Sequence, residues 1–134
     1  MSQENVEIVA QGYARFAETG ELNEEGTHPD FVWDMSTFAG WPERQTYEGT
    51  DGAGEFLASW TEPWDDWELE IEELIDAGGD EVIAVIRQHG TSKSTGLEVN
   101  MQFAQLWTIR DGKYLRMRMY ADPAEARRAA GLSG

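Results

Sequence analysis

The stretch LEVNMQFAQLWTIRDGKYLRMRMYA, residues 97–121, determines the fold more clearly than any other part of this chain. Two runs rich in apolar, β-branched and aromatic residues, 97–109 and 114–121, flank the short polar segment RDGK. A glycine in so short a connection permits the positive φ that tight hairpin turns need. The stretch therefore predicts two long antiparallel strands joined by a hairpin.

Two further strands are expected upstream of this hairpin. Residues 67–71 alternate between apolar and acidic side chains, which is the period of a half-buried strand. The alternation slips at Glu72 and Glu73, which indicates a β-bulge. VIAVIRQHG (82–90) has a long apolar run and predicts another strand. Glycine-containing turns separate these strands, so the second half of the chain is an antiparallel sheet.

Two helices are expected in the first half of the chain. Apolar residues recur at helical spacing between Asn5 and Ala17, and Gly20 would end this helix. A second helix carries an apolar stripe, starts from a cap at Thr50 or Asp51 and ends before a proline.

Short extended pieces at 31–35 and 45–49, joined by the loop STFAGWPE (36–43), lie between these helices. A last helix over 122–131 is indicated by Asp122 in the capping position, followed by proline. Helices followed by a run of strands predict an α+β fold. We expect a curved antiparallel or mixed sheet that wraps over about three helices and leaves a cone-shaped cavity.

Length and composition limit the number of domains, the possible partners and the possible chemistry of this protein. A chain of 134 residues is expected to form one domain over 1–134. The formal net charge of −16 disfavours nucleic acids and anionic membranes as partners. The absence of cysteine excludes disulfides and thiol chemistry. The sequence shows neither a membrane span nor a signal peptide, so a cytoplasmic protein is predicted.

Five stretches carry a resemblance to a known superfamily: ENVEIVAQGYARFAETGEL, HPDFVW, YEGTDGAGEFLASW, EELIDAGGDEVIAVIRQHG and FAQLWTIRDGKYLRMRMYADPAEA. In their order they resemble the nuclear transport factor 2-like superfamily, in particular its SnoaL-like branch. The resemblance implies a cone-shaped α+β barrel with a deep apolar pocket, usually dimeric. Its members include ketosteroid isomerases, polyketide cyclases, epoxide hydrolases, dehydratases and proteins without chemistry, so the resemblance predicts fold and not function.

The resemblance also suggests where acid–base residues would lie. In ketosteroid isomerases a tyrosine and a protonated aspartic acid stabilise the enolate while another aspartate moves the proton. Their places fall on Tyr13, on or near Gln105, and on Met35 or, with one inserted residue, Asp34. The histidine and aspartate of SnoaL-like cyclases would fall on Gln105 and near Met119, and neither side chain is ionisable.

The orientation of Asp34 separates two interpretations. If Phe31, Trp33 and Met35 face the helices, strand alternation turns Asp34 outward to solvent or an interface. A bulge would instead bury Asp34 among aromatic rings, where desolvation raises a carboxyl pKa towards that of a useful base. The sequence leaves both open.

A pocket for a small apolar organic ligand is predicted. Its apolar lining is expected to come from Phe16, Trp33, Met35, Phe56, Trp60, Phe103, Trp107, Met117 and Met119. Gln105 is the strongest polar candidate for a ligand contact, because it shares strand parity with Phe103 and Trp107. No cofactor is expected, and the two histidines lack the spacing of a metal site.

Three functions remain open at this stage. The first is a cofactor-free isomerase, cyclase or hydrolase with Asp34 as general base and Tyr13 and Gln105 as hydrogen-bond donors. The second is a protein that binds a ligand without chemistry, and the third is a dimerisation module. A homodimer is expected in each case. Under the second and third, Asp34→Asn should leave thermal stability and ligand uptake unchanged, whereas an enzyme would lose turnover.

Overall fold

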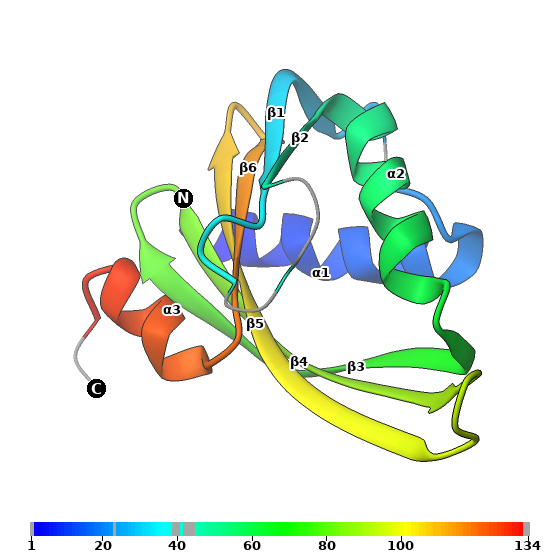
Figure 1. Cartoon of the computed structure of the whole chain (residues 1–134). Coiled ribbons are helices and arrows are strands. Elements are labelled where there is room, and N and C mark those ends of the chain that lie inside the picture. Colours follow the sequence, from blue (N-terminus) through cyan, green and yellow to red (C-terminus); the bar gives the residue numbers. More distant parts are fainter. Residues whose placement is uncertain (1, 23, 39–40, 42–44, 133–134) are drawn as a thin grey trace.

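The computed structural model of the chain describes residues 2–22, 24–38, 41 and 45–132, and the predicted loop at 36–43 lies partly outside them. Within these described residues, three helices and six strands follow one another (Figure 1). In order they are α1 (Ser2–Thr19), β1 (Thr27–Asp34), β2 (Thr46–Glu48), α2 (Gly49–Thr61), β3 (Trp64–Gly78), β4 (Glu81–Ser92), β5 (Glu98–Arg110), β6 (Lys113–Tyr120) and α3 (Pro123–Ala129).

The strands form one curved, mixed sheet in the order β2-β1-β6-β5-β4-β3. Strands β3 to β6 are antiparallel neighbours, as the hairpin pattern predicts, and β1 adds to β6 in parallel. The end strands β2 and β3 do not pair with each other, so the sheet is not closed. The expected α+β cone is confirmed.

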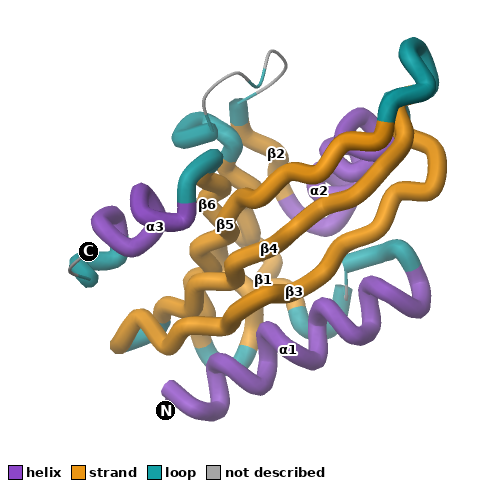
Figure 2. Tube along the Cα trace, turned by 90° about the horizontal axis from the view of Figure 1, so that it is seen from below, coloured by secondary structure: helices purple, strands orange, loops and turns teal. Residues whose placement is uncertain are grey.

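The helices cover both faces of this sheet (Figure 2). Helices α1 and α2 contribute Val9, Phe56 and Trp60 to the core on the inner face. Helix α3 packs on the outer face, where Ala126 joins a second buried cluster. The sheet therefore curves over two helices, and the third lies behind it.

Coverage of both faces explains the unbroken apolar run of β4. Val82, Ala84 and Ile86 belong to the inner core cluster, whereas Ile83 and Val85 belong to the cluster beneath α3. A strand buried on both faces loses the apolar–polar alternation of a half-exposed strand.

The element boundaries confirm several sequence signals and correct one. Gly20 ends α1 with a positive φ of 72°, the bulge of β3 lies between Ile71 and Glu73, and Asp122 caps α3 by accepting a hydrogen bond from the Ala124 N–H. The predicted cap of α2 at Thr50 or Asp51 is wrong. Helix α2 begins earlier, at Gly49, after an N-cap glutamate that makes no side-chain capping bond.

Candidate functional site

A small apolar cavity lies between the inner face of the sheet and helices α1 and α2. Its free volume is about 50 Å³, which is room for a few water molecules. The lining residues come from both helices and most strands: Val9, Gly12, Tyr13, Phe16, Leu22, Trp33, Phe56, Leu57, Trp60, Trp67, Leu69, Phe103, Gln105, Trp107, Tyr114 and Met119. None of these described lining residues carries a charged side chain.

Most of the side chains predicted from the sequence to line a pocket do so. These are Tyr13, Phe16, Trp33, Phe56, Trp60, Phe103, Gln105, Trp107 and Met119. The aromatic rings contact one another closely, as in Trp33 and Phe56, whose centroids are 4.8 Å apart. Such contacts form a continuous aromatic wall.

Met35 and Met117 were expected in the lining, and the structure places both in solid core instead. Each is fully buried and belongs to the inner core cluster without facing the cavity. Met117 pairs in register with Trp33 on one side and Trp107 on the other. These larger indoles reach the cavity, and the methionine fills the space between their strands.

Helical spacing on α1 is a sequence signal for some of the lining residues that were not predicted. Val9, Gly12, Tyr13 and Phe16 stand at positions i, i+3, i+4 and i+7 of α1 and all line the cavity. The lining residues on β3, Leu69 and the indole of Trp67, follow strand alternation. The missed residues are Val9, Gly12, Leu22, Leu57, Trp67, Leu69 and Tyr114.

Gly12 is required by close approach rather than by conformation. A Cβ at this position would lie 1.7 Å from the Tyr114 hydroxyl oxygen. The hydroxyl donates to the backbone carbonyl of Ile8 at 2.9 Å, so it ties β6 to α1 across the space that the glycine leaves.

Three polar side chains form a directed chain of hydrogen bonds at the cavity wall. The Trp107 Nε1–H donates to the Tyr13 hydroxyl oxygen at 2.9 Å. The Tyr13 hydroxyl in turn donates to Oε1 of Gln105. An indole nitrogen can only donate, and a phenol has a single proton, so the direction of this chain is fixed. The amide of Gln105 is held with its oxygen towards Tyr13.

Burial keeps both tyrosines of the cavity in the neutral form. It raises the pKa of Tyr13 far above its ordinary value, although the hydrogen bond from Trp107 acts in the opposite direction. Burial also raises the pKa of Tyr114 to about 12. Neither phenol is a base at neutral pH.

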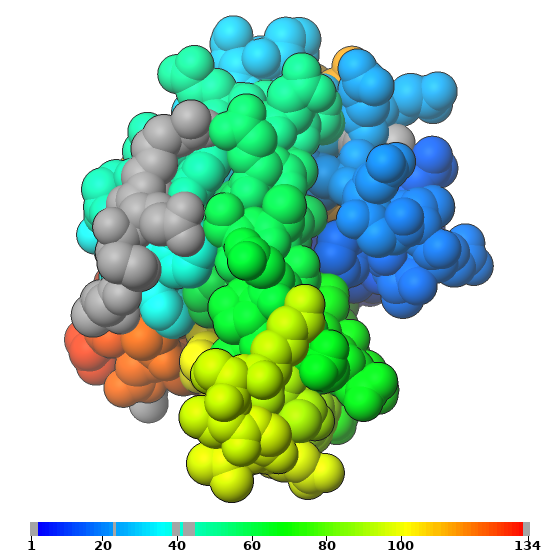
Figure 3. Space-filling model, turned by 45° about the vertical axis from the view of Figure 1, so that its right-hand side comes forward, coloured from blue at the N-terminus to red at the C-terminus, as the bar shows by residue number. Residues whose placement is uncertain are grey.

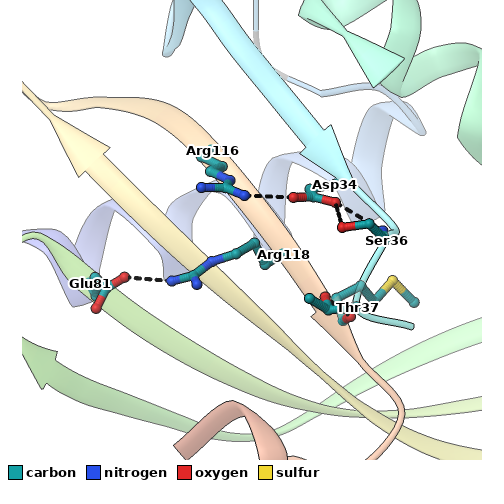
Figure 4. Close-up of polar contacts among 7 residues, drawn as sticks. Asp34, Ser36, Thr37, Glu81, Arg116 and Arg118 are labelled. Carbon is teal, nitrogen blue, oxygen red and sulfur yellow. Dashed lines mark hydrogen bonds and ion pairs between the residues drawn. The ribbon is translucent and has the colours of Figure 1, made fainter. Parts of the chain in front are cut away.

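Asp34 lies on the opposite face of the sheet, away from the cavity (Figure 4). Its Oδ2 accepts from Nη2 of Arg116 at 2.6 Å, and its Oδ1 accepts from the backbone N–H and the hydroxyl of Ser36 at 2.9 and 2.6 Å. Burial by itself would raise the pKa of Asp34, but the hydrogen bonds from Ser36 and Arg116 and the arginine charge outweigh it and lower the pKa. The carboxylate is ionised and fully engaged.

Further ion pairs lie on the outer face. Nη2 of Arg118 donates to Glu81 at 2.9 Å (Figure 4), and Nε of Arg87 donates to Glu72 at 3.0 Å. Arg118 of β6 is thus joined to β4, and Arg87 of β4 to β3, so both ion pairs link different strands of the sheet.

The structure brings together two of the three predicted catalytic residues. Tyr13 and Gln105 are hydrogen-bonded at the cavity, whereas Asp34 is paired with Arg116 behind the sheet. Within the described ranges, no group of three or more His, Asp or Glu side chains is placed to hold a metal ion. None of the described helices has the length and apolar character that crossing a membrane requires.

A family model described as the SnoaL-like domain matches residues 13–117, which is most of the chain. This chain belongs to the SnoaL-like domain family. A comparison with curated proteins gives no match.

Solved structures share the whole fold of this SnoaL-like domain. TerC, co-crystallised with polyporic acid, is 28% identical with a TM-score of 0.71, and the alignment covers 96% of this chain and 98% of TerC. A nuclear transport factor 2-like protein from Burkholderia thailandensis is 26% identical with a TM-score of 0.71 over 96% of this chain and 98% of its own. A protein described as a SnoaL-like polyketide cyclase, from Jannaschia sp. CCS1, is 22% identical with a TM-score of 0.69 over 98% and 94% of the two chains.

The cavity of this SnoaL-like domain adjoins an open cleft between α1 and α2. Figure 3 shows α2 (green) beside the surface of α1 and the segment that follows it (blue). The cleft has a volume of about 1150 Å³. Four residues line both cleft and cavity and so form the boundary between them: Phe16, Leu22, Leu57 and Trp67. The outer cleft is rich in acidic side chains: Glu21, Glu24, Glu25, Asp51 and Glu55.

Proposed function

We propose that this SnoaL-like domain binds a small, flat, predominantly apolar organic molecule in the cavity between the sheet and helices α1 and α2. One observation carries the proposal: the described lining consists of aromatic and aliphatic side chains with a few oriented polar groups and no charge. This composition is typical of small-molecule sites, in which apolar surface supplies affinity and a few polar atoms supply orientation.

A guest must widen the cavity as it enters. Ligand sites usually measure about 300–1,000 Å³, against about 50 Å³ here. The boundary residues Phe16, Leu22, Leu57 and Trp67 are each partly exposed, so they can move without opening the buried core behind them. Entry through the α1–α2 cleft therefore requires displacement of side chains and not unfolding of the sheet.

The charges around the cavity and the similarity to TerC narrow the chemical class of the guest. The acidic side chains of the outer cleft repel anions, and the uncharged cavity lining offers a cation no counter-charge, so a neutral guest is favoured. The co-crystal of TerC with polyporic acid supports an organic guest in a relative of the same fold. We therefore expect a neutral molecule with at least one aromatic ring.

Binding is favoured over proton-transfer chemistry by the placement of the ionisable groups. The described cavity lining contains no Asp, Glu or His, and the two tyrosines are held neutral by their raised pKa values. Asp34, the general base of the enzyme hypothesis, bonds to Arg116 and Ser36 on the other face. The cavity as it stands offers surface and hydrogen bonds, but no group to take up a proton.

Indane, a neutral two-ring hydrocarbon, tests the proposal without any polar group. We expect saturable binding, seen in ¹H–¹³C spectra as shifts of the methyl groups of Val9, Leu57, Leu69 and Met119, which line the cavity. Leu57→Trp should abolish these shifts, because a larger side chain at the boundary blocks entry. Leu97→Trp is the matched control, since Leu97 is 65% exposed, precedes β5 and does not line the cavity. Absence of saturable indane shifts in the unmodified protein would overturn the proposal.

The homodimer expected from the resemblance remains part of the proposal. Multi-angle light scattering at several concentrations tests it directly. A mass of one chain at all of them would contradict it.

A further inference from the structure

Strand β3 ends the sheet and leaves one long edge without a strand partner. It is the last strand in the order β2-β1-β6-β5-β4-β3, and among the described strands it pairs only with β4. Every second residue of such an edge strand turns its backbone N–H and C=O groups away from the sheet. These unpaired groups are a template for an extended segment of another chain.

An apolar groove runs beside this edge, between β3 and α1. Figure 2 shows α1 lying along β3, and the groove between them has a volume of about 660 Å³. Both elements contribute apolar side chains to it: Ala10, Ala14 and Ala17 of α1, and Leu69, Ile71 and Leu74 of β3. The three alanines are exposed, and their small side chains leave room for a neighbouring segment. A peptide that adds to a sheet edge gains affinity from main-chain hydrogen bonds and specificity from pockets for alternate side chains.

Strand alternation gives the two faces of β3 different chemistry. Leu69 and Ile71 pack against the inner core cluster, so Glu68 and Glu70 point to the outer face. A strand added at this edge would alternate in the same way. Its inward side chains would enter the apolar groove, and its outward side chains would lie beside the two glutamates.

The charge of the edge favours a basic occupant. Strand β3 carries no basic residue, and its acidic residues are Asp65, Asp66, Glu68, Glu70, Glu72, Glu73 and Asp76. Arginine side chains pair with Glu72 and Glu73. For Glu68 and Glu70, by contrast, no described lysine or arginine is a partner, and the nearest cationic group to Glu70 is the His89 imidazole at 3.6 Å. Lysine or arginine on an added strand would therefore meet uncompensated carboxylates.

The same charge argues against a second copy of this chain as the occupant. Two β3 edges paired with each other would bring acidic side chains opposite acidic side chains, which is destabilising. The formal net charge of −16 adds to the repulsion between copies.

We propose that the β3 edge and the adjoining α1 groove bind an extended segment of a partner protein, in which apolar side chains alternate with lysine or arginine. The segment adds to the sheet as a further strand beside β3. Its apolar side chains pack against Leu69, Ile71 and the α1 alanines, and its basic side chains lie beside Glu68 and Glu70. The register of β3 is regular over 68–71, between two irregularities, so a segment of about five to seven residues covers the pairing region. This interaction does not depend on a guest in the cavity.

The probe is a fluorescent heptapeptide with blocked termini, KVKVKVK, and its binding to the full chain is followed by fluorescence anisotropy. We expect saturable binding of KVKVKVK and none of the acidic counterpart EVEVEVE. The bound peptide should also slow hydrogen exchange of β3 amides that face the free edge, because they become hydrogen-bonded. Equal binding of the two peptides, or unchanged exchange along β3, would overturn the proposal.

Two N-methylated forms of KVKVKVK separate strand addition from attraction by charge alone. One form is methylated on the valine nitrogens and the other on the inner lysine nitrogens. Only one of these alternate sets can face β3. Methylation of that set should weaken binding by about tenfold or more through the loss of main-chain hydrogen bonds, and methylation of the other set by less than about threefold. Equal effects of the two methylations would show attraction by charge without strand pairing and would overturn the proposal.

Ala10→Lys tests the groove from the side of the protein. A long basic side chain at this exposed position fills the groove and repels the peptide, so the affinity for KVKVKVK should fall by about tenfold. Gln11→Lys is the matched control, because it adds the same charge to the next residue of α1, which is exposed and lies outside the groove lining. It should change the affinity by less than about threefold. Lysine is a good helix former, so both variants should fold.

The remaining outcomes are decisive as well. Equal affinities of the two variants for KVKVKVK would place the peptide elsewhere and overturn the proposal. If light scattering shows that the unmodified chain is an oligomer that Ala10→Lys dissociates, the edge belongs to a second copy, and the proposal is likewise overturned.

Discussion

Replacement of Asp34 by asparagine isolates the ion pair behind the sheet. The Asp34 side chain is 6% exposed, whereas that of Arg116 is 48% exposed. Asparagine keeps an oxygen for the two bonds from Ser36, but it replaces the charged acceptor that faces Arg116 with an amide NH₂ group, which cannot accept the arginine's hydrogen bond. The substitution therefore tests the contribution of the charged contact with little change in shape.

The expected loss of stability follows from that geometry. A hydrogen bond to a charged group contributes about 1.5–3 kcal/mol when protected, and the half-exposed arginine reduces this through solvent screening. We expect Asp34→Asn to lower the free energy of unfolding by about 1–2 kcal/mol at pH 7. The ion pair with Arg116 thereby corrects the unchanged thermal stability that the sequence led us to expect for a binding protein. The unfolding entropy of a chain of 134 residues is about 0.28 kcal/mol/K. The melting temperature should therefore fall by about 4–7 °C.

The effect should depend on pH in one direction. The pKa of Asp34 is lowered in the folded state, so the unfolded chain binds its proton more readily. The stabilisation is then complete above the unfolded pKa of about 3.9 and is lost as the pH falls through the lower folded value. The difference in stability between the two proteins should stay constant from pH 7 to about pH 5 and shrink below pH 4.

Urea unfolding followed by circular dichroism between pH 3 and 7 measures this difference. Asp30→Asn is the matched control, because Asp30 stands on the same strand with a side chain 84% exposed, and it should change stability by less than about 0.5 kcal/mol. Affinity for indane should be unchanged, since Asp34 does not line the cavity. A loss below 0.5 kcal/mol, or a difference that grows as the pH falls, would refute the reasoning.

Three further outcomes are expected. Gly12→Ala should lower the free energy of unfolding, measured in urea, by about 2–3 kcal/mol, because the added methyl group overpacks against the Tyr114 hydroxyl. Adding Tyr114→Phe should recover part of that loss. Equal stability of the single and double variants would contradict this explanation. Titration of phenol absorbance at 295 nm should show Tyr114 ionising near pH 12 and Tyr13 at a higher pH. Because both pKa values are raised in the folded state, the free energy of unfolding should decline as the pH rises from about 10, where the phenols of the unfolded chain ionise. Asp122→Ala should cost about 1 kcal/mol in thermal melts by removing the cap bond to Ala124, whereas no change would show that the cap contributes nothing.

The sequence predicts the fold because its signals are local and agree with one another. The hairpin around Gly112, the bulge after Ile71 and the cap at Asp122 each specify one feature without knowledge of the rest. The cap of α2 was misassigned because Thr50 and Asp51 are good capping residues in sequence, but Gly49 already enters the helix. Tertiary packing overrides so weak a preference.

The candidate site was predictable only in part, because alternation gives the face of a residue and not its depth. Alternation correctly turns Phe103, Gln105 and Trp107 inward. It turns Met117 inward by the same rule, yet the indoles on the neighbouring strands cover it. Which inward residues reach free space depends on the sizes of their cross-strand neighbours. Those neighbours are known only once the register is known.

The two adjacent residues Trp33 and Asp34 show how one strand can serve two separate purposes. Strand alternation turns the indole into the cavity and the carboxylate onto the outer face, where it bonds to Arg116 of the neighbouring strand. The ion pair and the backbone pairing together hold β1 against β6, and this register sets Trp33 beside Met117. Loss of the Asp34 charge should therefore weaken the sheet without altering the cavity lining. If Asp34→Asn abolished the binding of indane, the two faces would be coupled, and the ion pair would belong to ligand recognition as well as to stability.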